Sequence, residues 1–287
     1  MSGGPERPLS LAALTVLELA PPAMVEVAAQ AGYSHVGLRL LPATPTERHF
    51  SLLADGALCR QTQARLRETG MQVLDVEILR LEPATQVDAF APVLELGAEL
   101  GARHVLVAGN DPEFDRQAER LAALCDLCRP LGLLPHLEFM PWTAVPDLAA
   151  AMALVAATGR DDAAILVDAF HFDRSGSSLD QLARVPAQRL GYAQLCDVLG
   201  PRPSAMAEIL RQAREERCFP GEGSADLLTL LRQLPIGLPL SLEVPTRGLR
   251  EQGVSPLQRA RRALVGARGL LQQLQAHSGL VSSLARS

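Results

Sequence analysis

The sequence predicts a single α/β domain, a (β/α)8 TIM barrel followed by a C-terminal helical extension. Short apolar runs alternate with helical patterns along the chain, and the run at 164–168 is typical of a strand in a buried parallel sheet. The chain has 287 residues, 48% of them hydrophobic, and suits one barrel of about 250 residues better than two small domains. The sequence contains no GxGxxG motif to support a dinucleotide-binding sheet. We therefore expect one domain over residues 1–287, with the barrel core at about 8–250 and the extension at 254–277.

The helices that separate the strand runs have recognisable ends. Pro21 begins the first helix, Asp55 caps the second, and Gly70 ends the second. Pro112 suits the first position of another helix. Glu113, which follows it, also favours a helix start there, because its negative charge interacts well with the helix dipole. We expect strands at 9–14, 35–40, 73–79, 103–108, 133–138, 164–168, 191–197 and 238–244, and helices at 21–32, 57–69, 85–101, 113–128, 146–159, 179–185, 204–214 and 225–234.

An apolar stripe follows the last strand. From Leu257 to Leu274 the apolar residues recur at alternating steps of three and four, which predicts one amphipathic helix. The stripe is wider than one barrel helix requires. We expect it either to cover the outside of the barrel or to form the contact of a homodimer.

Charge and hydropathy exclude two classes of partner. The net charge is -5 and the longest basic block is Arg261-Arg262, so no nucleic acid is expected to bind. No run approaches the roughly 18 apolar residues of a spanning helix, and the N-terminus lacks a signal pattern. We therefore expect a cytoplasmic protein without a membrane partner.

Two residue types narrow the chemistry. The five cysteines are scattered, which suits a reducing compartment, and Cys125-x-x-Cys128 lies inside a helical pattern with no second pair to complete a zinc site. All 27 basic residues are arginine, because the sequence contains no lysine. This excludes a lysine Schiff base, pyridoxal-phosphate chemistry and a P-loop lysine.

Four apolar runs carry an oxygen-bearing side chain at or near their ends: Glu138, Asp168, Gln194 and Glu243. They are separated by 30, 26 and 49 residues, and a strand-helix repeat takes about 30, so they fall in consecutive repeats with one insertion. Barrel active sites lie at the C-terminal ends of the strands, where all four are expected.

Three carboxylates that converge in this way repel one another unless a cation neutralises them. An all-oxygen set favours Mg²⁺ or Mn²⁺ as that cation. The alternative is that each acid caps a helix or pairs with an arginine.

The order of these residues carries a resemblance. Glu138, Asp168-x-x-His171, Gln194 three residues before Asp197, Pro220-Gly221-x-Gly223 and Glu243 together resemble the sugar phosphate isomerase/epimerase superfamily, the xylose-isomerase-like TIM barrels, over nearly the whole chain. The resemblance implies that Glu138, Asp168, Gln194 and Glu243 hold one Mn²⁺, Mg²⁺ or Co²⁺. It also implies that the substrate chelates this metal, and that Glu138 and Glu243 exchange a proton on either face of an enediolate. His171 and Arg217 would then bind substrate.

The implied function is a divalent-metal-dependent isomerase or epimerase of a small sugar, keto acid or sugar phosphate. Gln194 departs from the histidine usual in epimerases and is similar to hydroxypyruvate isomerase and to bacterial 3-dehydroshikimate dehydratases. A metal-dependent dehydratase, a lyase of the 3-dehydroshikimate or inosose dehydratase type, is therefore the alternative. A DNA endonuclease of the superfamily would need a basic face, and a non-catalytic sugar-binding barrel would lack one glutamate.

The second strand run departs from the family as well. Many members have an acid after this strand, whereas here Arg39 occupies that region and favours an anionic substrate. Arg39, Arg80 and Arg217 are the candidates for anchoring a carboxylate or a phosphate.

Overall fold

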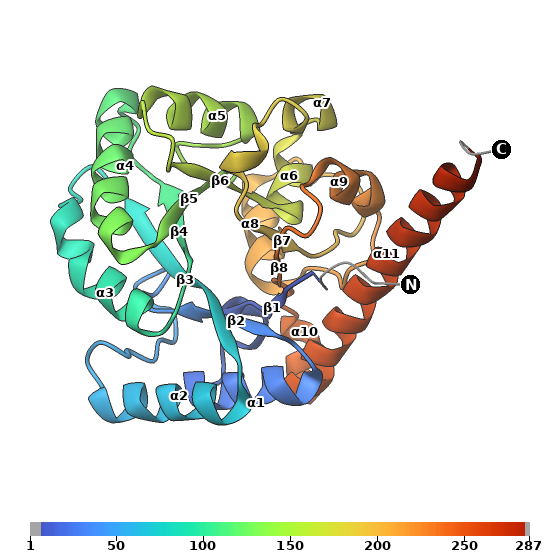
Figure 1. Cartoon of the computed structure of the whole chain (residues 1–287), viewed down its shortest axis with the longest axis horizontal. Coiled ribbons are helices and arrows are strands. Elements are labelled where there is room, and N and C mark those ends of the chain that lie inside the picture. The colour runs from blue at the N-terminus through green and yellow to red at the C-terminus, as the bar shows by residue number, and fades with distance from the viewer. Residues whose placement is uncertain (1–6, 285–287) are drawn as a thin grey trace.

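Eight parallel strands close into a barrel in sequence order, β1 to β8, which confirms the predicted fold class. The computed structural model describes residues 7–284, with side chains for residues 7–276. Helices surround the strands, as Figure 1 shows. The strands are β1 (Leu9–Leu11), β2 (His35–Arg39), β3 (Gln72–Leu81), β4 (His104–Gly109), β5 (Leu134–Glu138), β6 (Ala164–Asp168), β7 (Ala193–Leu195) and β8 (Leu240–Leu242).

The helices lie where the sequence places them, with differences at their ends and two additions, at 169–175 and 247–251. They are α1 (Pro21–Ala31), α2 (Gly56–Thr69), α3 (Ala91–Glu99), α4 (Phe114–Cys128), α5 (Leu148–Ala157), α6 (Ala169–Ser175), α7 (Leu179–Leu182), α8 (Met206–Glu215), α9 (Leu227–Gln233), α10 (Arg247–Glu251) and α11 (Pro256–Leu284). Within the described residues, no helix is both long enough and apolar enough to span a membrane.

Several helix starts differ from the sequence prediction. Pro112 does not occupy the first position of α4 as expected, because Glu113 is the N-cap and the helix begins at Phe114. The third helix begins at Ala91 and not near residue 85, because Pro92 lacks the amide hydrogen that an earlier start would require and stands in its first turn. The sequence also missed α6, which begins directly after β6. Asp168 caps this helix by accepting a hydrogen bond from the His171 backbone amide at 3.0 Å.

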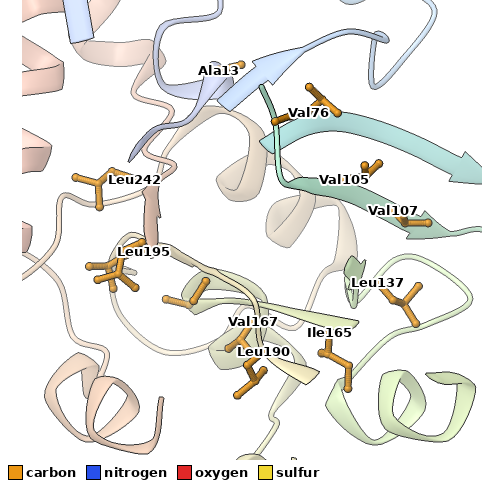
Figure 2. Packing of buried hydrophobic residues seen from close by; sticks show 14 of the residues in the cluster. Ala13, Val76, Val105, Val107, Leu137, Ile165, Val167, Leu190, Leu195 and Leu242 are labelled. Atoms are coloured by element: carbon orange, nitrogen blue, oxygen red, sulfur yellow. The ribbon is translucent and has the colours of Figure 1, made fainter. Parts of the chain in front are cut away.

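Alternation along the strands divides the side chains into two layers. Leu137, Val167, Leu195 and Leu242 belong to the large cluster that fills the space between the strands and the surrounding helices, part of which Figure 2 shows. Their neighbours in sequence, Glu138, Asp168, Gln194 and Glu243, must point the opposite way, into the barrel. A one-residue shift in register would reverse this arrangement, so the outer apolar layer fixes which side chains face the interior.

The apolar stripe of α11 packs against the barrel. Ala260, Ala263, Leu264, Ala267 and Leu270 are buried and belong to the outer core cluster. The Tyr33 hydroxyl, which follows α1, donates a hydrogen bond to the Ala260 carbonyl at 2.9 Å. The predicted C-terminal helix is therefore present, and its stripe covers the outside of the barrel.

Candidate active site

The four predicted ligands lie at the C-terminal end of the barrel. Glu138 and Asp168 are the last residues of β5 and β6, Gln194 is the middle residue of β7, and Glu243 directly follows β8. All four are at most 4% exposed. Asp168 is paired in register with Gln194, which brings these two side chains next to each other.

The amide of Gln194 joins two of the carboxylates. One of its terminal atoms lies 3.0 Å from Asp168 Oδ2 and 3.0 Å from Glu138 Oε1. With nitrogen in this position the amide donates hydrogen bonds to both carboxylates, and with oxygen there three oxygen atoms converge. Nitrogen in this position satisfies both carboxylates, and rotation of the amide would present the three oxygen donors that a divalent cation accepts.

An imidazole completes a candidate metal cluster. Ligand atoms of Glu138, Asp168 and His171 lie within 4.8 Å of one another, and His171 Nε2 is 3.6 Å from Glu138 Oε1. Glu243 does not belong to this tight group, because its carboxylate is held by Arg217. The residues present therefore fit a divalent ion, with Glu138, Asp168 and Gln194 as oxygen donors and His171 as a nitrogen donor beside them.

Arg217 neutralises two of the acids. Its Nη1 lies 2.7 Å from Asp168 Oδ2 and its Nη2 lies 3.0 Å from Glu243 Oε2. Its Nε donates to the Ala213 carbonyl at 2.9 Å, and the guanidinium lies 5.0 Å from the centroid of the Phe170 ring. The guanidinium is therefore fixed between the two carboxylates, and it also lines the cavity described below.

Asp197 positions the loop that carries Arg217. Its backbone pairs with Cys218, and its Oδ2 accepts hydrogen bonds from the Gly221 and Gly223 amides at 3.1 and 3.0 Å. A Cβ atom on Gly223 would lie 2.4 Å from Asp197 Oδ1, so glycine is required for this close approach. The Gln-x-x-Asp and Pro-Gly-x-Gly motifs thus form one unit, a role for Asp197 that the sequence motif alone did not reveal.

Burial shifts the protonation of the site. Burial raises the pKa of Glu138 well above its usual range, and the charges of Asp168 and Glu243 add to the rise. Burial also raises the pKa of Glu243 to about 7, although Arg217 opposes it. Burial works in the same direction on Asp168, but Arg217 outweighs it and the pKa of Asp168 is lowered. Glu243 consequently titrates near neutral pH, and Glu138 keeps its proton to a higher pH than an ordinary glutamate does.

These groups open into one cavity of about 460 Å³, a size suited to a small-molecule ligand. Glu138, His171, Arg217 and Glu243 line it, and so does Trp142, whose ring lies 5.1 Å from that of His171 in an edge-on arrangement. The cavity lining therefore combines charged side chains with aromatic and apolar ones, among them Trp142 and Met140.

Arg39 also lines this cavity, but its charge is taken up by two glutamates. Its Nη1 lies 2.7 Å from Glu47 Oε2 and its Nη2 lies 3.2 Å from Glu77 Oε1. Sequence reasoning missed both glutamates, and the contact of Arg39 with Glu77 follows from the register in which β2 pairs with β3.

Two other histidines lie outside the cavity lining. His104 and His136 form an aromatic cluster with Tyr192 inside the barrel, with ring centroids 4.8 to 5.0 Å apart. They are core residues, as their positions in strand interiors suggested.

A closed parallel barrel whose strand ends gather buried carboxylates, an amide and an imidazole around one cavity defines a (β/α)8-barrel protein with a candidate metal centre. The sequence model of the family described as xylose isomerase-like TIM barrel matches residues 25–266. The chain belongs to this family, which confirms the resemblance drawn from the motifs.

Among curated relatives, an inosose isomerase from Bacillus velezensis is 24% identical over 235 residues, which cover 77% of this chain and 81% of the relative. A 3-dehydroshikimate dehydratase from Pseudomonas aeruginosa is 28% identical over 167 residues, which cover 54% of this chain but only 25% of the relative. The prediction of an isomerase-type enzyme agrees with the inosose isomerase among these relatives.

Solved structures share the fold. A crystal structure of the IolI protein with a bound zinc atom has a TM-score of 0.76 at 18% identity, and the match covers 93% of this chain and 99% of that one. A structure of L-ribulose 3-epimerase has a TM-score of 0.66 at 16% identity, with 96% and 97% covered.

Proposed function

We propose that this protein is a divalent-metal-dependent isomerase or epimerase of a small sugar, keto acid or sugar phosphate. The observation that carries the proposal is the pair Glu138 and Glu243, two buried glutamates of raised pKa that line one cavity from β5 and from the end of β8. Strands β6 and β7 separate them in the barrel, so they approach a bound substrate from different sides.

Proton transfer follows from this arrangement. One glutamate removes the proton from the carbon next to the substrate carbonyl, and the other returns a proton to the carbonyl carbon or to the opposite face of the same carbon. When the proton goes to the carbonyl carbon, the hydroxyl proton of the first carbon passes to the former carbonyl oxygen, so that the carbonyl moves by one position. The first outcome is isomerisation and the second is epimerisation. Arg217 fixes Glu243 and Asp168, and Trp142 and the apolar wall exclude water from the reacting carbons.

A divalent ion held by Glu138, Asp168 and Gln194 would supply a Lewis acid that polarises the carbonyl, and Glu243 would join these ligands only by leaving Arg217. The convergence of the Gln194 amide with two carboxylates supports such an ion. Manganese, magnesium and cobalt suit the oxygen donors, and the imidazole of His171 also suits zinc. We expect about one ion per chain by elemental analysis after loading and dialysis.

A dehydratase is the second candidate, supported by the relative from Pseudomonas aeruginosa. It would use the same base to remove the proton and would then expel a hydroxyl from the next carbon. The protein residues involved are the same, so only the product separates the two reactions.

Deuterium exchange tests the proposal. The protein is incubated in heavy water with a panel of ketoses, keto acids and their phosphates, and NMR follows deuterium entering the carbon next to the carbonyl. Isomerisation gives an aldose or shifted ketose, epimerisation an inverted centre, and dehydration a product that has lost one water. Each reaction begins with the same removal of a proton, so one panel covers all three.

Matched variants identify the base. Glu138→Gln and Glu243→Gln should each lower exchange by about 10²- to 10⁴-fold, because each removes a proton acceptor. Glu119→Gln, an exposed position on α4, should leave it unchanged. Exchange that survives in both cavity variants would contradict the assignment of Glu138 and Glu243 as the proton-transferring groups. A protein that takes up no metal after loading would contradict the proposed metal dependence.

A further inference from the structure

The cavity wall carries an excess of positive charge in a protein that is negative overall. Eight arginines and six glutamates line the cavity, whereas the net charge of the chain is -5. Four of these arginines form ion pairs with carboxylates of the same wall: Arg39, Arg217, Arg247 and Arg259. An excess of positive charge in a cavity favours anionic ligands.

Arg80 has a different environment from these four. It stands near the end of β3, half-buried, and donates from Nε to the Ala43 carbonyl and from Nη1 to Asn110 Oδ1, each at 3.1 Å. Both acceptors are uncharged, and among the described residues no carboxylate lies within ion-pair distance of its guanidinium. The two hydrogen bonds fix its orientation but leave the charge without a counter-ion in a partly dehydrated place, which is costly.

Arg214 on α8 lines the same cavity and is close enough to Arg80 for the two charges to interact. Burial lowers the pKa of Arg80, Glu138 opposes this, and Arg214 lowers it further. Two guanidinium groups that repel each other across a cavity are stabilised when an anion binds between them. Arg80 and Glu138 line the same cavity, so an anion bound by Arg80 would lie in the cavity of the proposed base.

Two further cavity arginines, Arg48 and Arg250, are exposed, and Arg48 stacks 4.9 Å above the Phe50 ring. Exposed arginines without an ion pair are ordinary and do not define a binding site by themselves. Arg214 is exposed as well, so the half-buried Arg80 with its two hydrogen bonds defines the subsite and Arg214 adds charge to it.

We propose that Arg80 and Arg214 bind an oxyanion of the substrate, either a carboxylate or a phosphate. This inference rests on the function proposed above and narrows it, because the substrates are then small keto acids or sugar phosphates and not neutral ketoses. Arg39, which the sequence suggested for this role, is already neutralised by Glu47 and Glu77, whereas Arg80 is held in place and free to bind an anion.

Binding of inorganic phosphate tests the subsite without any reaction. Calorimetric titration of the metal-loaded protein should give a dissociation constant for phosphate. Arg80→Gln should raise this constant by about 10- to 100-fold, the range for a charge-assisted hydrogen-bond pair. Arg80→Lys should recover most of the affinity, because it keeps the charge. Arg232→Gln, an exposed arginine of α9 outside the cavity lining, should bind as the unaltered protein does.

Arg80 also holds a loop through Ala43, so its variants must first be compared by circular dichroism and unfolding midpoint. If Arg80→Gln does not fold, Arg214→Gln carries the test, because an exposed side chain can be replaced without loss of the fold. Phosphate that binds all variants equally, or does not bind the unaltered protein, would overturn the subsite.

Exchange in heavy water with three related compounds identifies the kind of anion. Dihydroxyacetone is neutral, dihydroxyacetone phosphate carries a phosphate, and hydroxypyruvate carries a carboxylate. One of the two anions should exchange at least about 100-fold faster than the neutral compound, and Arg80→Gln should abolish that preference. Equal rates for all three would refute the inference and leave the proton-transfer function intact. Phosphate binding that depends on Arg80, in a protein that exchanges no compound of the panel, would refute the function and leave the subsite intact.

Discussion

Replacing Arg217 by glutamine should destabilise the protein strongly, because it removes the counter-ion of two buried acids. The side chains of Arg217, Asp168 and Glu243 are 2%, 0% and 6% exposed, and the ion-pair distances are 2.7 and 3.0 Å. Removing one partner of a buried ion pair costs about 3–5 kcal/mol, since the remaining charge stays buried. We therefore expect Arg217→Gln to lower the free energy of unfolding by about 3–5 kcal/mol.

The control is an arginine whose ion pair is exposed. Arg262 pairs with Glu222 at 2.5 Å, but the two side chains are 51% and 41% exposed, and such pairs contribute about 0–1 kcal/mol. Urea unfolding of both variants, followed by circular dichroism in the presence of a chelator, gives the comparison. A divalent ion that binds the native state should then recover part of the loss in Arg217→Gln, by about 2.7 kcal/mol at 100 times its dissociation constant. A loss below about 1 kcal/mol in Arg217→Gln, equal to that of Arg262→Gln, would refute the role given to this ion pair.

Two further predictions concern the scaffold. Burial lowers the pKa of His104 to about 4, below the value near 6.5 of an unfolded chain, so unfolding takes up an extra proton between these pH values. His104 should therefore contribute a fall in stability of about 1.4 kcal/mol per unit as the pH drops through that window, beside the contributions of His136 and His171, whose pKa values burial also lowers. In urea unfolding at pH 7, 6 and 5, His104→Gln should lose that part of the slope relative to the unaltered protein, and parallel curves for the two proteins would contradict it. On α11, Leu264→Ala should cost about 2–5 kcal/mol because Leu264 is 2% exposed, whereas Val265→Ala, at a residue that is 70% exposed, should change stability by less than about 0.5 kcal/mol, as thermal unfolding will show. Equal effects of the two substitutions would mean that α11 does not pack on the barrel as described.

The sequence was sufficient for the barrel because its signals are local. Each strand is a short apolar run, each helix has its own end signals, and the two alternate at nearly constant spacing. The same local periodicity placed Glu138, Asp168, Gln194 and Glu243 at one end of the barrel, because residues that flank outward-facing Leu137, Val167, Leu195 and Leu242 must face inward. The sequence did not predict α6, because its seven residues are too few to show a helical period and because Asp168 is both the end of a strand and the cap of the helix.

What only the tertiary structure decided is which charges meet. Arg217 joins Asp168, which is 49 residues away in the sequence, and Arg39 joins Glu77, which is 38 residues away. These pairs exist because the tertiary fold brings different strands and loops to one place: Arg39 and Glu77 are register partners on β2 and β3, and the loop after β7 brings Arg217 to the end of β6. No local pattern records that geometry. For the same reason the sequence named Arg39, Arg80 and Arg217 alike as possible anion-binding residues. The folded chain separates them, because carboxylates already neutralise Arg39 and Arg217, whereas Arg80 faces the cavity with only uncharged hydrogen-bond acceptors.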